Sequence, residues 1–124
     1  MQVGTSCLLF AIALFGLAGC SHPSHSALSL SVGDPDRGMA SISRYGCGAC
    51  HTIPGISGAH GLVGPPLSGI AGRMYVAGVL PNRPLAMIQW IRDPRSVDEK
   101  TAMPNLGVSA RDAADIAAYL YSLQ

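Results

Sequence analysis

The chain has 124 residues, of which 48% are hydrophobic, and its 8 basic and 7 acidic residues leave a formal net charge of +1. This length allows one ordinary domain with short extensions. The balanced charge without a Lys/Arg cluster argues against a nucleic-acid-binding protein, and the high hydrophobic content argues against generic disorder. The 15 glycines and 9 prolines predict a loop-rich fold.

The first twenty residues have the pattern of an export signal. From Leu8 to Ala18 the chain carries no charge, and this run fits a signal-peptide core of roughly 7–15 residues better than a membrane span of about 20. The sequence LAGC at residues 17–20 resembles the lipobox of bacterial lipoprotein precursors. We therefore predict a lipoprotein-type signal peptide over residues 1–19, with an ordinary cleaved signal or a retained anchor as alternatives. The predicted location is the bacterial periplasm, with lipid on Cys20 tethering the protein to a membrane.

The next segment is rich in serine and carries no charge as far as Gly33. It predicts a lipidated N-terminus and flexible tether over residues 20–33, followed by one folded domain over residues 34–124. The domain is expected to open with a short polar helix that has Asp36 as its N-cap.

A Cys-x-x-Cys-His motif follows this helix, formed by Cys47, Cys50 and His51. Two thiols one helical turn apart can add across the two vinyl groups of haem, and the adjacent imidazole can bind the iron. The motif therefore predicts one covalently attached haem c, with His51 as an iron ligand. There are three alternatives. A zinc site would need four ligands, and beside the three residues of the motif only His60 lies nearby in the sequence. A thioredoxin-like redox pair would need a βαβ pattern, and a structural disulfide would leave His51 without a role.

Downstream of the motif, the sequence predicts two helices and a loop between them. The first helix runs from about Pro84 to Arg92. The second runs from Ser109 to Leu123, with Ser109 as its N-cap and an acidic residue three positions later. Its apolar positions follow helical spacing and are expected to face the short polar helix that opens the domain. These positions are Ala113, Ile116, Ala117, Leu120 and Leu123.

With these features in place, the chain from Gly38 to Leu123 resembles the class I cytochromes c, a family of small, mostly helical electron carriers with one haem. Gly38 and Ile42 match the family's first-helix contact positions, and GPPL at 64–67 matches its Gly-Pro-x-Leu segment. The segments WIRDP, TAMP and DIAAYLY also resemble bacterial haem-c domains associated with terminal oxidases. The resemblance implies an all-α fold, with N- and C-terminal helices packed against each other around the haem.

The resemblance also implies roles around the cofactor. The Pro65 carbonyl would accept a hydrogen bond from His51, which would fix the orientation of the imidazole. Leu67 would pack on the haem face. Arg73 would lie near a haem propionate, the alternative being a solvated surface arginine, and Trp90 would approach the haem as well as anchor the core.

The sixth iron ligand is predicted to be Met103. It precedes Pro104, which prevents helix continuation and favours an extended loop, and the family places its axial methionine in such a loop. The other candidates are Met39, Met74, Met87 and His60. The three methionines lie in a predicted helix or an apolar stretch, where packing in the core is expected, and the histidine is expected on an exposed loop. An open sixth position is the remaining alternative.

The sequence thus predicts an electron-transfer protein rather than an enzyme. With His51 and Met103 as axial ligands, it would serve as a one-electron carrier or electron-transfer subunit in a bacterial periplasmic respiratory chain. Its partners would be redox proteins, namely a terminal oxidase, a dehydrogenase or another cytochrome, with no nucleic acid. It would act as a monomer or as a subunit of a complex. The alternatives are a peroxidase-like haem enzyme or a gas sensor, each with an open sixth position.

Overall fold

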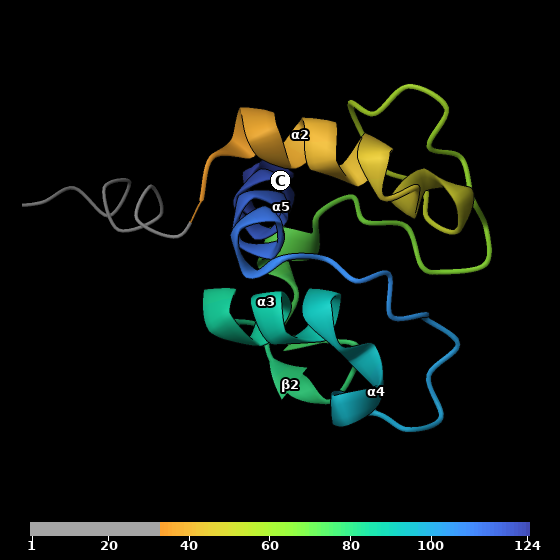
Figure 1. Ribbon diagram of the computed structural model, residues 1–124, viewed down its shortest axis with the longest axis vertical. Helices are drawn as coiled ribbons and strands as arrows, with labels where there is room; N and C mark the ends of the chain where they lie inside the picture. The colour runs from red at the N-terminus through yellow and green to blue at the C-terminus, as the bar shows by residue number, and fades with distance from the viewer. Residues whose placement is uncertain (1–32) are drawn as a thin grey trace, which may run out of the picture.

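The computed structural model describes residues 33–124 (Figure 1). The predicted signal peptide, the lipidation at Cys20 and nearly all of the predicted tether lie outside the described residues. The described part contains four α-helices: α2 (Pro35–Arg44), α3 (Pro84–Arg92), α4 (Pro94–Val97) and α5 (Ala110–Ser122). None of its helices is long and apolar enough to cross a membrane.

Short elements occupy the chain between α2 and α3. They are two 3-10 turns, Cys47–Ala49 and Ile70–Gly72, and two strands, β1 (Tyr75–Val76) and β2 (Leu80–Pro81), which pair antiparallel. Long loops make up the rest of this region (Figure 1). The fold is therefore mostly helical, as predicted, with one small surface hairpin.

Helix α2 begins earlier than predicted, and its N-cap is Asp34 rather than Asp36. The Asp34 carboxylate accepts hydrogen bonds from the backbone N–H groups of Asp36 and Arg37, at 2.9 and 3.0 Å. Pro35 is the first helical residue. Proline suits that position because its fixed φ is already helical and no backbone N–H is needed there. The prediction of Asp36 as N-cap was wrong because this Asp-Pro start signal was missed.

Helix α5 begins and ends close to the predicted positions. Ser109 caps it by accepting a hydrogen bond from the Asp112 N–H at 3.1 Å. The predicted apolar positions Ala113, Ile116, Ala117 and Leu120 are all buried in the core. Leu123, just past the end of the helix, packs partly against that core.

Helices α2 and α5 cross in direct contact, as expected for the two terminal helices of the domain (Figure 1). The contact depends on Gly38, because a β-carbon there would overlap the backbone carbonyl of Asp115. Ile42, one turn further along α2, is only 1% exposed and packs in the core with Ile116. The glycine allows the two backbones to approach, and the isoleucine fills the space beside them.

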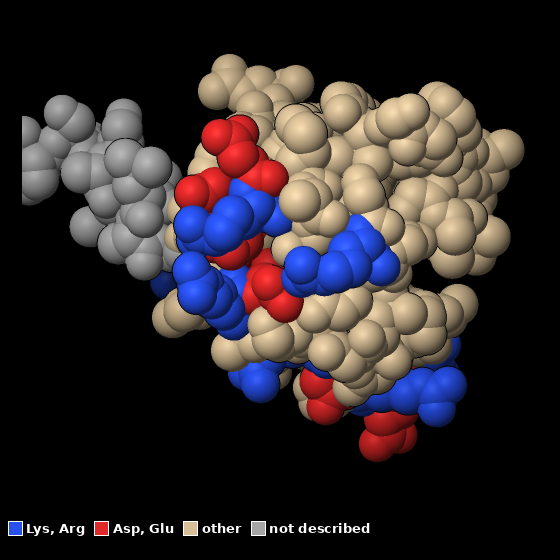
Figure 2. Space-filling view, turned by 45° about the horizontal axis from the view of Figure 1, so that its top comes forward, with Lys and Arg blue, Asp and Glu red and all other residues tan. Residues whose placement is uncertain are grey.

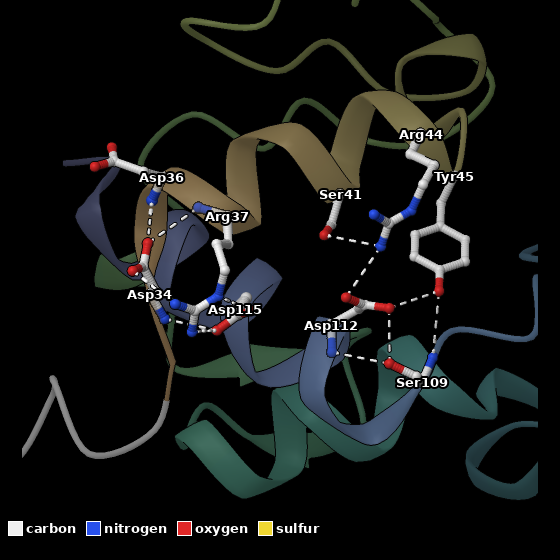
Figure 3. Close-up of polar contacts among 9 residues, drawn as sticks. All are labelled: Asp34, Asp36, Arg37, Ser41, Arg44, Tyr45, Ser109, Asp112 and Asp115. Atoms are coloured by element: carbon white, nitrogen blue, oxygen red, sulfur yellow. Dashed lines mark hydrogen bonds and ion pairs between the residues drawn. The ribbon is translucent and has the colours of Figure 1, made fainter.

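Polar side chains join the same two helices along one edge (Figure 3). At the start of α2, Arg37 Nε donates to Asp115 at 2.8 Å, and the Asp34 N–H donates to the same carboxylate at 2.7 Å. The hydrogen bond from Arg37 holds the pKa of the buried Asp115 below its usual value. This carboxylate therefore stays ionised although it is almost completely buried.

A second polar cluster lies at the other end of α2 (Figure 3). Arg44 pairs with Asp112 at 3.0 Å, and the Tyr45 hydroxyl donates to the same carboxylate at 2.8 Å. Hydrogen bonds from Ser109 and Tyr45 lower the pKa of Asp112. The N-terminal turn of α5 is thereby tied to the last turn of α2.

Two methionines that were expected in the core are on the surface. Met39 is 40% exposed and Met74 is 80% exposed, whereas Met87 on α3 is buried as predicted. Met39 directly follows Gly38, so helical geometry turns its side chain away from α5. Met74 begins an apolar stretch that forms a surface hairpin, in which Val76 supplies the buried side chain.

Candidate haem site

The Cys-x-x-Cys-His motif begins directly after α2. Gly46 adopts a left-handed conformation with φ of 70°, which starts a new turn there. The backbone N–H groups of Cys50 and His51 both donate to the Cys47 carbonyl, at 3.2 and 3.0 Å. The two cysteines are therefore one turn apart, and both thiols are free and half-buried. Burial raises the pKa of the Cys47 thiol.

The His51 ring is held by the GPPL segment at residues 64–67, as the family resemblance implied. Its Nδ1 atom lies 2.8 Å from the Pro65 carbonyl oxygen. Because a carbonyl can only accept, Nδ1 carries the hydrogen in this contact, and Nε2 is then the nitrogen with the lone pair in the neutral imidazole. Gly64 lies against the ring, and a β-carbon there would overlap the imidazole. The ring orientation and its tautomer are thus set by residues 64 and 65.

This segment is anchored along the motif by backbone hydrogen bonds. The Gly61 N–H donates to the Gly48 carbonyl at 3.0 Å, and the Gly64 N–H donates to the Cys50 carbonyl at 2.7 Å. Further on, the N–H of Leu67 donates to the Thr52 carbonyl at 2.9 Å. Leu67 is half-buried and packs against the core.

A hydrogen-bonded clamp, formed by Asn82 and Tyr121, supports the next part of this loop. The Asn82 amide donates to the backbone carbonyls of Ile70 and Arg73, at 2.8 and 2.7 Å. Its carbonyl oxygen accepts a hydrogen bond from the Tyr121 hydroxyl of α5 at 2.7 Å. This role of Asn82 was not predicted from the sequence. The available signal was an asparagine between two prolines, in a segment that cannot be helical and favours bonds from side chain to backbone.

The remaining predicted residues are placed as follows. Arg73 donates from its guanidinium to the backbone carbonyls of Pro66 and Ser68, within the loop that follows His51. Trp90 lies half-buried on α3, packed against the core. Met103 is half-buried in the segment between α4 and α5, where its N–H donates to the Thr101 hydroxyl at 3.1 Å. His60 is exposed, as predicted.

Hydrogen bonds connect only some of these side chains. They join His51 to Pro65 and Arg73 to the loop after it, whereas no hydrogen bond links Met103 or Trp90 to His51 in residues 33–124. In Figure 1 the loop that follows the motif and the segment between α4 and α5 lie on the same side of α5.

The donor atoms present fit a covalently attached haem. Two free thiols one turn apart are followed by an imidazole whose Nε2 is available as a ligand. Within residues 33–124 no three His, Cys, Asp or Glu side chains gather into a group that could hold a metal ion, as the zinc alternative would require.

Comparison with known proteins agrees with this geometry. The family model of cytochrome c matches residues 36–124, which include the motif and all four described helices apart from the first residue of α2. The chain belongs to the cytochrome c family. Membership implies a covalent haem c, with which the positions of Cys47 and Cys50 are consistent, and an electron-carrying role.

This cytochrome c is also similar to part of a larger protein. Cytochrome c oxidase subunit 2 of Alkalihalophilus pseudofirmus is 31% identical over 103 residues, which cover 78% of this chain and 29% of that protein. The chain therefore spans less than a third of the length of this relative.

Proposed function

We propose that this cytochrome c is a one-electron carrier or electron-transfer subunit whose iron is held by His51 and Met103. The observation that carries the proposal is the 2.8 Å contact between His51 Nδ1 and the Pro65 carbonyl. The contact occupies Nδ1, which leaves Nε2 to bind the iron, and it makes the imidazole a stronger ligand. When bound, the haem supplies reversible one-electron redox chemistry.

Met103 is the proposed sixth ligand because of its place in the chain. It lies in the non-helical segment before α5, and its backbone is held by Thr101. The competing methionines are less suitable. Met87 is buried in the core, and Met39 and Met74 point to the surface. A thioether ligand that fills the sixth position leaves no site for a substrate, which favours electron transfer over catalysis.

The other residues shape the surroundings of the cofactor. Leu67 and Trp90 are half-buried apolar side chains that would cover the haem and exclude water from it. Arg73 would provide a positive charge near a propionate while its guanidinium braces the loop carbonyls of Pro66 and Ser68.

We further propose a periplasmic setting, with lipid on Cys20 and a terminal oxidase as redox partner. The export-like N-terminus and LAGC sequence support the setting. The similarity to an oxidase subunit 2 supports the partner. Cell fractionation of Cys20→Ser against wild type tests the anchor. The variant is expected in the soluble periplasmic fraction, and retention of the variant in the membrane fraction would contradict lipid anchoring at Cys20.

The axial ligands are tested by absorption spectra of the haem-loaded protein, oxidised and reduced, with and without carbon monoxide. Wild type should be low-spin and indifferent to carbon monoxide, whereas Met103→Ala should bind it in the reduced state. Met74→Ala removes an exposed methionine and is the matched control, expected to behave as wild type. Binding of carbon monoxide by the reduced wild type would overturn the carrier proposal and favour an open iron for catalysis or gas sensing.

A further inference from the structure

Large apolar side chains are exposed on the hairpin formed by β1 and β2 and on the first turn of α3. Met74 is 80% exposed, Tyr75 53%, Val79 51% and Leu85 79%. The two parts are adjacent, because the Asn82 N–H donates to the Met74 carbonyl at 2.9 Å and Leu85 follows three residues later. We call these four exposed side chains the hairpin patch.

The backbone holds the hairpin in a fixed shape. Tyr75 pairs with Pro81 across the two strands, and the Val79 N–H closes the turn by donating to the Val76 carbonyl at 3.1 Å. Val76 is buried beneath the hairpin, so the neighbouring Tyr75 faces outward. In Figure 1 the hairpin lies beyond α3, toward the opposite end of the domain from α2 and the motif that follows it. The hairpin patch is therefore separate from the site of haem attachment.

Basic residues without acidic partners border the hairpin patch. From Arg73 to Arg92 the sequence has three arginines and no Asp, Glu or Lys, although the net charge of the chain is only +1. The ion pairs within residues 33–124 involve only Arg37 and Arg44 of α2. Figure 2 shows basic and acidic side chains of that region next to one another. Arg83, directly before α3, is exposed and takes part in none of these pairs, so its charge is available to an anionic surface.

We propose that the hairpin patch docks on an anionic lipid surface, with its apolar side chains among the headgroups and the bordering arginines against lipid phosphates. This inference rests on the lipid-anchored periplasmic setting proposed above. Apolar side chains next to basic ones are the combination by which peripheral proteins bind anionic membranes, and tyrosine is enriched at the level of the headgroups. Arginine suits the border because its guanidinium can stay at the phosphates while its aliphatic part covers apolar surface.

The chain between Cys20 and the domain is long enough to permit this docking. The fourteen residues 20–33 span at most about 46–50 Å when fully extended. A domain of about 90 residues has a radius of gyration of roughly 12 Å. A lipid on Cys20 would therefore allow any face of the domain to reach the membrane, and it would raise the effective concentration of the hairpin patch there. Because the tether itself selects no face, the choice of face falls to the charge and polarity of the domain surface.

A lipid surface is favoured over a protein as the occupant. Its negative charge is continuous, so arginines spread between residues 73 and 92 all find phosphates, whereas a protein would have to present acidic groups at matching positions. Docking through the hairpin also leaves the Cys-x-x-Cys-His motif toward the other end of the domain (Figure 1). The attached haem would thus remain available for electron exchange while the domain rests on the membrane.

Oxidation of surface methionines gives a footprint of the docked state. The lipidated, haem-loaded protein is reconstituted on phosphatidylcholine vesicles with or without phosphatidylglycerol, and oxidation by chloramine-T is followed by peptide mass spectrometry. With phosphatidylglycerol, Met74 should react at least about fivefold more slowly than on phosphatidylcholine alone, and high salt should restore its reactivity. Met39 on α2 is 40% exposed and serves as the internal control, expected to react equally on both vesicles.

A charge reversal at the patch and a matched one elsewhere identify the docking surface. Arg83→Glu should abolish the protection of Met74, since each basic residue at an anionic surface strengthens binding by about fivefold and the new carboxylate is repelled. An acidic residue next to the start of a helix is favourable, so α3 should be preserved. Ala40→Glu/Ser43→Glu makes the same change in net charge at exposed positions of α2. Its protection of Met74 should stay within about twofold of wild type, because charges further than a Debye length from the contact are screened.

Four results would overturn the inference. They are equal oxidation of Met74 on the two kinds of vesicle, full protection by phosphatidylcholine alone, undiminished protection in Arg83→Glu, and equal loss of protection in the α2 variant. If Met74 were protected in native membranes but not on vesicles, the hairpin patch would contact a membrane protein instead. Failure of the lipid anchor is seen separately, as wild type that does not sediment with phosphatidylcholine vesicles. Docking is then measured by sedimentation of wild type and Arg83→Glu with excess phosphatidylglycerol vesicles, and equal binding of the two would contradict it.

Discussion

Nδ1 of His51 and the carbonyl oxygen of Pro65 are 2.8 Å apart, so the position of the imidazole depends on a residue fourteen positions further along the chain. The two residues lie in separate loop segments. These segments are joined by the hydrogen bond from the Gly64 N–H to the Cys50 carbonyl. A disturbance anywhere along this arrangement should therefore be detectable at the iron ligand.

Gly64→Ala should disturb the ligand directly. The new methyl group would overlap the His51 ring, so the ring has to rotate or the chain has to shift. We expect less haem-loaded protein and an altered low-spin spectrum in what remains, both measured by absorption against total protein. Gly72→Ala is the control, since a β-carbon there meets nothing within 4 Å. Equal yield and equal spectra for the two variants would contradict this view of Gly64.

Asn82→Ala should destabilise the haem-loaded protein by about 1–3 kcal/mol, because the amide donates two hydrogen bonds to backbone carbonyls that are left unpaired. Tyr121→Phe removes a single bond, that to the Asn82 side chain, and should cost about 0.5–1.5 kcal/mol. Urea unfolding measures both. If Tyr121→Phe were less stable than Asn82→Ala, the proposed role of the Asn82 amide would be contradicted.

Gly38→Ala should weaken the contact between α2 and α5. The methyl group would overlap the Asp115 carbonyl, so the helices must separate, at a cost of about 1–3 kcal/mol or more. Met39→Ala, at the exposed neighbouring position, should stay within about 0.5 kcal/mol of wild type. Thermal unfolding monitored by circular dichroism compares them, and a variant at Gly38 as stable as wild type would disprove the close approach.

Acid should remove the stabilisation that Asp115 provides. The hydrogen bond from Arg37 lowers the pKa of this carboxyl in the folded protein. Its contribution is therefore complete above the unfolded-state pKa of about 3.9 and is lost as the pH falls through the lower folded-state pKa. Asp115→Asn should be less stable than wild type at pH 7, and urea unfolding should show this difference shrinking below about pH 4. A difference that stays constant down to pH 2 would contradict the role of the ionised carboxylate.

The sequence was sufficient to predict the helices that follow strong local signals. Ser109 followed three residues later by Asp112 located the start of α5, and the spacing of Ile116 and Leu120 identified its buried face. The start of α2 was misplaced because Asp34 and Asp36 are both suitable caps, and only the intervening Pro35 distinguishes them.

The parts that could not be predicted depend on contacts between distant residues. The Asn82 clamp joins residues 39 positions apart, and no local pattern specifies which hydroxyl meets that amide. The exposure of Met74 follows from the hairpin that begins beside it, since a short apolar stretch has no periodicity that separates surface from core. At the candidate site, the role of the Cys-x-x-Cys-His motif followed from its own chemistry, whereas the position of Pro65 facing His51 was predictable only from the family resemblance.

The contact between α2 and α5 also bears on the order of events during biosynthesis. Since a ribosome makes the chain from its N-terminus, Cys47 and Cys50 exist well before Ala110–Ser122 is complete. Gly38 lies against the backbone of Asp115 and the side chain of Tyr119, so the contact between α2 and α5 cannot form until that last helix is made. The two thiols are half-buried in the finished fold, and we expect them to be more accessible to haem before this contact forms.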